Sequence, residues 1–112
     1  DAAKEFERAL SARPKPELAT ELRYRLGHCK EKLGDADGAL RSYQEAAAQG
    51  DKGDTFRLSA VARAAVLYET KRDVPRAIAA YRDLIRNGKD PELIAAATDR
   101  VAQLEGGAGH RR

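Results

Sequence analysis

The sequence predicts an all-α fold of about six helices, arranged as a stack of antiparallel helical hairpins. Its alanine and its long charged residues are strong helix formers. Valine, isoleucine and threonine together supply only eleven residues, fewer than a sheet protein of this size normally uses. Turn-forming residues divide the chain at regular intervals, which predicts helices at about 1–12, 16–33, 37–49, 55–71, 75–87 and 91–105.

Clusters of proline, glycine and aspartate mark the ends of these helices. They occur at 14–16, 34–38, 50–54, 72–75 and 87–91, and a glycine-rich segment begins at Gly106. Asp90 is expected to cap the last helix, with Pro91 at its first helical position. Gly50 and Gly88 each follow a helix, where a left-handed residue is expected to end it.

Apolar residues recur at helical spacing within the predicted helices, so each helix is expected to turn one face toward a core. The stripes are Leu18, Leu22, Leu26, Cys29 and Leu33 in the second helix, Leu58, Val61, Ala65 and Tyr68 in the fourth, and Ile94, Ala97, Val101 and Leu104 in the sixth.

The chain also matches itself after a shift of 37 or 38 residues. The matching groups are Ala2, Ala39 and Ala77; Phe6, Tyr43 and Tyr81; Ala9 and Ala46; Asp35 and Asp73; and Gly50 and Gly88. The small residues let a neighbouring helix approach closely, and the aromatic ring fills the space beyond them. One hairpin cannot cover its own apolar face, so a repeat of this length predicts stacked hairpins.

These residues resemble the tetratricopeptide repeat, in a long form found in bacterial proteins. The matching residues are Leu26, Gly27, Gly34, Ala39, Tyr43 and Ala46 in one repeat and Ala65, Tyr68, Ala77, Ile78 and Tyr81 in the next. Lys30 and Arg72 depart from the family pattern at an aromatic and a glycine position, and the spacing exceeds the family's usual period of about 34 residues. The resemblance implies a right-handed superhelical solenoid.

The resemblance also divides the chain into repeats. Residues 1–14 match the second helix of a truncated repeat, 16–50 and 54–88 match two repeats, and 91–105 matches a capping helix. Residues 1–105 are therefore expected to form one repeat domain at the end of a longer array. Residues 106–112 are expected to be a flexible C-terminal tail.

Little in the sequence predicts catalysis. The neighbouring His28 and Cys29 diverge by about 100° on a helix and cannot share a metal ion. Gly106–Gly109 follows a helix instead of opening one, so it does not match a phosphate-binding loop. We therefore expect no enzymatic activity, no cofactor and no metal site.

The charge, hydropathy and cysteine content of the sequence indicate which partners and which cellular compartment to expect. With 21 basic and 18 acidic residues the charge is nearly balanced, which disfavours nucleic acid as a partner. No apolar run approaches 18 residues, so membrane insertion is not expected. The single Cys29 allows no intrachain disulfide, which slightly favours the cytoplasm over the bacterial periplasm and leaves the compartment otherwise open.

The resemblance implies a protein–protein interaction scaffold that holds a partner peptide or domain in a concave groove lined by first helices. Placing the sequence on the family gives the partner-binding residues Tyr24, Arg25, His28, Glu31, Lys32, Arg63 and Val66. Tyr24 and His28 replace a lysine and an asparagine with which some family members bind acidic tails, so that ligand is disfavoured. Tyr24 lies off the apolar stripe, and it either anchors a partner or packs on the preceding helix.

Two other functions remain open. The chain could serve only as the structural terminal cap of a longer array. It could also self-assemble into a homo-oligomer through its N-terminal helix, whose apolar residues Phe6 and Ala9 lack a covering neighbour.

Overall fold

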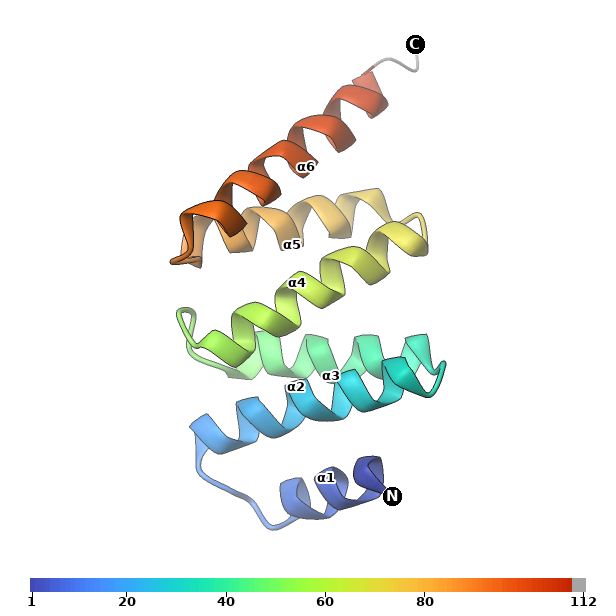
Figure 1. Cartoon of the computed structure of the whole chain (residues 1–112), viewed down its shortest axis with the longest axis vertical. Helices are drawn as coiled ribbons and strands as arrows, with labels where there is room; N and C mark the ends of the chain where they lie inside the picture. Colours follow the sequence, from blue (N-terminus) through green and yellow to red (C-terminus); the bar gives the residue numbers. More distant parts are fainter. Residues whose placement is uncertain (110–112) are drawn as a thin grey trace. The chain divides into compact units, whose positions relative to one another are not determined.

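The structure, a computed structural model, describes residues 1–109, with side chains described through Gly106. This part of the chain forms six α-helices (Figure 1). They are α1 (Ala2–Ser11), α2 (Pro16–Lys32), α3 (Ala36–Gln49), α4 (Thr55–Thr70), α5 (Val74–Asn87) and α6 (Pro91–Gly109). The all-α prediction is confirmed, and the first five helices begin and end within one residue of their predicted limits.

Helix α6 is longer than predicted. It continues through Gly109, although its expected end was residue 105. No proline interrupts this segment, and glycine weakens a helix by about 1 kcal/mol relative to alanine without blocking its hydrogen bonds. The remainder of the predicted tail, residues 110–112, lies outside the described residues.

The helices belong to two compact units, Asp1–Ala60 and a second unit from Val61 onward. In the first unit, α1 packs on α2 and α2 packs on α3, and successive helices run in opposite directions (Figure 1). In the second unit, α5 packs on α6. The boundary lies inside α4 and not in the predicted loop at 50–54, because the first turns of α4 are attached to α3 by Arg57.

Arg57 is a buried cation, with only 2% of its surface exposed. Its Nε donates to the carbonyl oxygen of Ala47 on α3 at 2.9 Å, and its Nη1 donates to that of Lys52 at 3.1 Å. The last carbonyls of a helix have no partner within the helix and carry partial negative charge. Arg57 therefore satisfies the end of α3 and fixes the loop before α4.

The ends of α2 and α4 repeat each other in backbone detail. Gly34 and Arg72 both have positive φ, 83° and 62°. The amides of the following residues, Asp35 and Asp73, donate to carbonyl oxygens five residues earlier at 2.9 and 2.8 Å. This is the Schellman arrangement, in which a left-handed residue closes the helix. The 38-residue period seen in the sequence is thus present in local structure.

The starts of α3 and α5 repeat in the same way. Asp35 has φ −93° and ψ 77°, and Asp73 has φ −92° and ψ 75°. The carboxylate of Asp35 accepts from the amide of Gly38 at 2.9 Å, and that of Asp73 accepts from the amide of Arg76 at 3.3 Å. Each aspartate satisfies an amide that has no partner within its helix.

The prediction that Gly50 and Gly88 are left-handed is wrong. Gly50 has φ −79° and ψ 156°, and Gly88 has φ −68° and ψ 155°. Both residues are extended, and the amide of each still donates to the carbonyl oxygen four residues earlier, so α3 and α5 end on an ordinary helical hydrogen bond. Left-handed residues occur instead at Gly34 and Arg72, and at Arg13 after α1.

Small and aromatic residues form the core, as the repeated pattern predicts. Ala39, Tyr43 and Ala46 on α3 have no exposed surface, and neither has Ala77 on α5. Helix α2 meets Tyr43 at Gly27, where an added Cβ would lie 2.6 Å from the ring. A glycine at this position allows the ring to pack directly on the backbone of α2.

Two residues of the predicted α2 stripe are not in the core. Leu18 is 48% exposed and Leu33 is 73% exposed. They lie near the two ends of α2, which has 17 residues, whereas the neighbouring α1 has only ten. At 1.5 Å per residue, α1 is about 10 Å too short to cover both ends.

Helix α1 carries no fully buried residue although its apolar and polar sides are well separated. Phe6 and Ala9 are half-buried, whereas Tyr43 and Ala46 at the matching positions of α3 are fully buried. The apolar side of α1 is thus only partly covered within the first unit.

Candidate functional site

An aromatic cluster lies on the first unit at the exposed side of α2. The rings of Tyr24 and His28 are nearly parallel, with an interplanar angle of 11° and centroids 6.2 Å apart. Tyr24 also lies 6.0 Å from the ring of Tyr43 on α3 and 6.0 Å from that of Phe56 at the start of α4. Pairs of aromatic rings at such distances attract one another and hold their geometry.

Arg25 covers one side of this cluster. Its guanidinium carbon lies 5.4 Å from the centroid of the Phe56 ring, a cation–π distance. Its Nε donates to the Glu21 carboxylate at 2.8 Å. Arg25 is therefore positioned by two neighbours, while about half of its side chain, 49%, stays exposed.

The ring of Tyr24 lies against rings of α3 and α4, which follow α2 in the chain, and remains half-buried. Its role as an anchor for a partner stays a prediction. Together with the exposed His28 the ring presents an ordered aromatic surface to solvent. We call Tyr24, Arg25, His28 and Phe56 the aromatic platform.

The other predicted binding residues of α2 differ in their surroundings. Glu31 is half-buried and accepts a hydrogen bond of 2.7 Å from the hydroxyl of Tyr43, which gives it a structural role. Lys32 is exposed one turn beyond His28, on the same side of α2. Arg63 and Val66 lie on α4 in the second unit, where Arg63 is half-buried and Val66 is 39% exposed.

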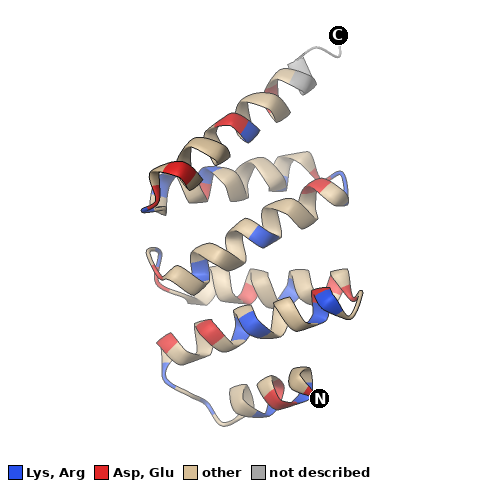
Figure 2. Cartoon of the chain, in the orientation of Figure 1, with Lys and Arg blue, Asp and Glu red and all other residues tan. Residues whose placement is uncertain are grey.

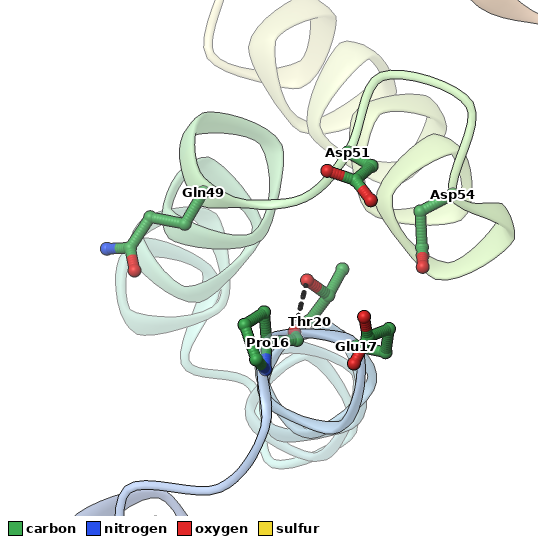
Figure 3. A pocket seen from close by; sticks show the side chains of 6 residues that line it. All are labelled: Pro16, Glu17, Thr20, Gln49, Asp51 and Asp54. Carbon is green, nitrogen blue, oxygen red and sulfur yellow. Dashed lines mark hydrogen bonds between the residues drawn. The ribbon is translucent and has the colours of Figure 1, made fainter.

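Acidic residues come first along α2, and lysine and arginine predominate further along it (Figure 2). Glu17 and Glu21 lie toward its start, and Arg25, His28 and Lys32 lie toward its end. Near the start of α2 a recess of about 20 Å³ is lined by Glu17, Thr20, Asp51 and Asp54, with Pro16 and Gln49 (Figure 3). Two of its carboxylates, those of Asp51 and Asp54, come from the loop before α4, and the third belongs to Glu17 of α2. This end of α2 is therefore acidic.

Two side chains of the recess have hydrogen-bond partners within the protein. Thr20 is buried, and its hydroxyl donates to the Pro16 carbonyl at 3.0 Å. One carboxylate oxygen of Asp54 accepts from the amide of Arg57 and caps α4. Within the described part of the chain, no three histidine, cysteine or acidic side chains are grouped so as to hold a metal ion.

The second unit contains a polar network that joins three helices. Glu69 on α4 accepts hydrogen bonds from the hydroxyl of Tyr81 on α5 and from the guanidinium of Arg100 on α6. Arg82 and Glu105 form a further ion pair between α5 and α6. The network determines how α6 lies on its neighbours within this unit.

The network also changes the ionisation of its members. Desolvation acts to raise the pKa of Glu69, but hydrogen bonds from Arg100 and Tyr81, with the charge of Arg100, bring the pKa below its ordinary value. Desolvation, together with the neighbouring Glu69 carboxylate, raises the pKa of Tyr81 to about 12. Both shifts favour the hydrogen-bonded form, with Glu69 ionised and Tyr81 neutral.

The sequence did not identify two members of this surface and network. Phe56 follows the exposed Leu18 by 38 residues, and neither belongs to the buried core. That match of two apolar residues outside the core was a usable signal. Arg100 pairs with Glu69, which is 31 residues away, and this pairing has no trace in the local sequence.

Comparisons with known proteins give no relative: no family model, no curated protein and no solved structure matches the chain. Among residues 1–109, no helix is both long enough and apolar enough to cross a bilayer.

Proposed function

We propose that this chain is a protein-interaction module, and that it binds a peptide or partner domain on the exposed face of α2. The observation that supports this most is the aromatic platform. Tyr24, His28 and Phe56 hold one another in place, and Arg25 is fixed over Phe56. Ordered aromatic and arginine side chains lose little entropy on binding, and they dominate the affinity of many interfaces.

We further infer that the hairpins α2–α3 and α4–α5 are tetratricopeptide-like repeats of an array. The matched left-handed residues Gly34 and Arg72, and the matched helix caps Asp35 and Asp73, support this. So does the bond from each core tyrosine hydroxyl to a glutamate twelve residues earlier, Tyr43 to Glu31 and Tyr81 to Glu69. In such an array α2 and α4 are first helices, and Arg63 and Val66 would extend the binding surface.

Site-specific photo-cross-linking tests the proposed function. A photoreactive amino acid is placed at His28 in the platform, or at Arg41 on α3 as a matched exposed control. Each protein is irradiated in a lysate of the source cell, and cross-linked peptides are mapped by mass spectrometry. The expected result is a partner joined to position 28 and not to position 41, and lost when Tyr24→Ala is added. Cross-links at position 41 alone would place binding on another face.

The half-covered helix α1 supports a second candidate function, self-association. Phe6 and Ala9 retain exposure that the matching residues of α3 have lost. Light scattering over a dilution series measures the mass of the assembly. If α1 forms the contact, Phe6→Glu converts the oligomer to monomer, whereas Glu5→Lys on the exposed side of α1 leaves it intact. An unchanged oligomer in the Phe6 variant would exclude this face.

A further inference from the structure

We infer that the segment bound on α2 is an extended peptide with an aromatic side chain at its centre, a basic residue on one side and an acidic residue on the other. This inference rests on the proposed function and adds the chemistry of the partner. It follows from one surface within the first unit, on which the aromatic platform lies between an acidic end and Lys32 and itself contributes Arg25 and His28.

The acidic end combines two segments of the chain. Glu17 lies in the first turn of α2, and Asp51 and Asp54 come from the loop between α3 and α4. Their carboxylates surround one recess (Figure 3). The helix dipole alone favours an acidic residue such as Glu17 at this position. Asp54 caps α4 with one of its carboxylate oxygens. Asp51 adds a further carboxylate from the same loop, and this end is therefore suited to a lysine or arginine from outside.

Lys32 lies at the other end of α2, and Arg25 and His28 of the aromatic platform are basic residues on the same face. Spacings of three and four residues put their side chains on one face of α2. His28 and Lys32 are exposed, and Arg25 is half-exposed beside its Glu21 partner. A carboxylate on a partner would meet the positive charges of Arg25 and Lys32, which lie further along α2 than the acidic end.

The aromatic platform lies between the two ends. Tyr24 is seven residues beyond Glu17 and eight before Lys32 in α2. Its ring is accompanied by His28 and Phe56, so a further aromatic ring can add to the group in an offset or edge-on arrangement. The partner's anchor is therefore expected between its two charged groups.

The length of the surface sets the spacing in the partner. Glu17 and Lys32 are fifteen residues apart in α2, which at 1.5 Å per residue is about 22 Å. An extended peptide covers this distance with about seven residues at 3.3 Å each. A peptide whose charges all have the same sign would be repelled at one end of this surface. Charge complementarity therefore favours a peptide with its positive and negative charges at opposite ends.

Synthetic peptides test this inference. The first peptide, about nine residues long, has two lysines at one end, a central phenylalanine and two glutamates at the other end. The second has the same composition with the charges alternating along its length. Two more carry only lysines or only glutamates around the phenylalanine. Fluorescence anisotropy with the full chain at low salt measures each dissociation constant. The separated peptide is expected to bind about tenfold more tightly than the other three.

Variants of the chain then test the placement. Lys32→Glu is expected to abolish the preference for separated charges, whereas Lys89→Glu, the same change at an exposed residue of the second unit, is expected to keep it. Tyr24→Ala is expected to weaken the binding of all four peptides by a similar factor. Equal binding of the alternating peptide, tighter binding of a single-sign peptide, or no binding of any peptide would overturn the inference. The cross-link at position 28 decides the proposed function independently of these results.

Discussion

Gly34 and Arg72 occupy the same left-handed position, one at the end of α2 and the other at the end of α4, 38 residues further along the chain. Their φ values are 83° and 62°. A left-handed conformation costs a residue with a Cβ about 1–2 kcal/mol, whereas glycine adopts it freely. Arg72 therefore holds strain that Gly34 does not.

We expect Arg72→Gly to raise the free energy of unfolding by about 0.5–1 kcal/mol. The gain is smaller than the strain because glycine also increases the entropy of the unfolded chain. Gly34→Ala should lower the stability by about 1 kcal/mol. Urea unfolding followed by circular dichroism measures both. Arg72→Ala, which removes the side chain and keeps the Cβ, is the control and should not reproduce the gain.

The close approach of α2 to Tyr43 predicts a second effect. A Cβ at position 27 would lie 2.6 Å from the ring, so Gly27→Ala must displace α2 or the tyrosine. Although alanine is the better helix former, overpacking of this kind costs about 1–3 kcal/mol. We expect Gly27→Ala to lower the unfolding midpoint, and to do so much less in a Tyr43→Leu background. An equal loss in both backgrounds would show that the ring is not the cause.

The sequence was sufficient for the features that depend on neighbours along the chain. The caps Asp35 and Asp73, the alanine–tyrosine faces of α3 and α5 and the ends of five helices follow from local spacing and turn chemistry. These features were recognisable because each occurs twice at the same distance.

Features that depend on distant or non-repeating contacts were not accessible. Arg57 has alanine at the matching position 38 residues earlier, and a charged residue is ordinarily expected at the surface. Its partners are backbone carbonyls, which have no signature in the sequence. Only part of the aromatic platform could be predicted from the sequence. Tyr24, Arg25 and His28 share a helix face, whereas Phe56 reaches them only because the fold places the start of α4 beside α2.

The buried Arg57 gives a third prediction. Its removal takes a buried side chain out of the fold and leaves the carbonyls of Ala47 and Lys52 without this donor. We expect Arg57→Ala to cost about 2–4 kcal/mol. Arg57→Lys cannot donate to both carbonyls from one planar group, so it should recover only part of the loss. Thermal unfolding measures both variants. Arg41→Ala, at an exposed position of α3, is the matched control and should stay within about 0.5 kcal/mol of the native chain.

The raised pKa of Tyr81 predicts a loss of stability at alkaline pH. The tyrosine is neutral in the folded chain up to a pKa of about 12, whereas its ordinary pKa is 10.0. The corresponding stability is complete below pH 10 and is lost as the pH rises toward 12. In Tyr81→Phe we expect a lower stability at pH 7, because a hydrogen bond is lost, and a weaker decline between pH 10 and 12.

Ultraviolet absorbance at alkaline pH gives an independent measurement of this group. One tyrosine of the native chain should ionise near pH 12, and that late step should disappear in Tyr81→Phe. Tyr24→Phe, which removes a tyrosine from the other unit, should leave the late step in place. A late step that survives in Tyr81→Phe would show that another group is responsible.

The acid side of the same network gives the last prediction. The pKa of Glu69 lies below its ordinary value of 4.5, so the ionised form stabilises the fold above that pH and the contribution disappears as the pH falls through the lowered pKa. Glu69→Gln keeps an acceptor but loses the attraction to Arg100. We expect it to be less stable than the native chain at pH 7, with a difference that shrinks below pH 4.5. Urea midpoints measured across this range test it, and Glu92→Gln at the exposed start of α6 should change stability by less than about 0.5 kcal/mol. A difference at Glu69 that did not depend on pH would mean that its charge does not contribute.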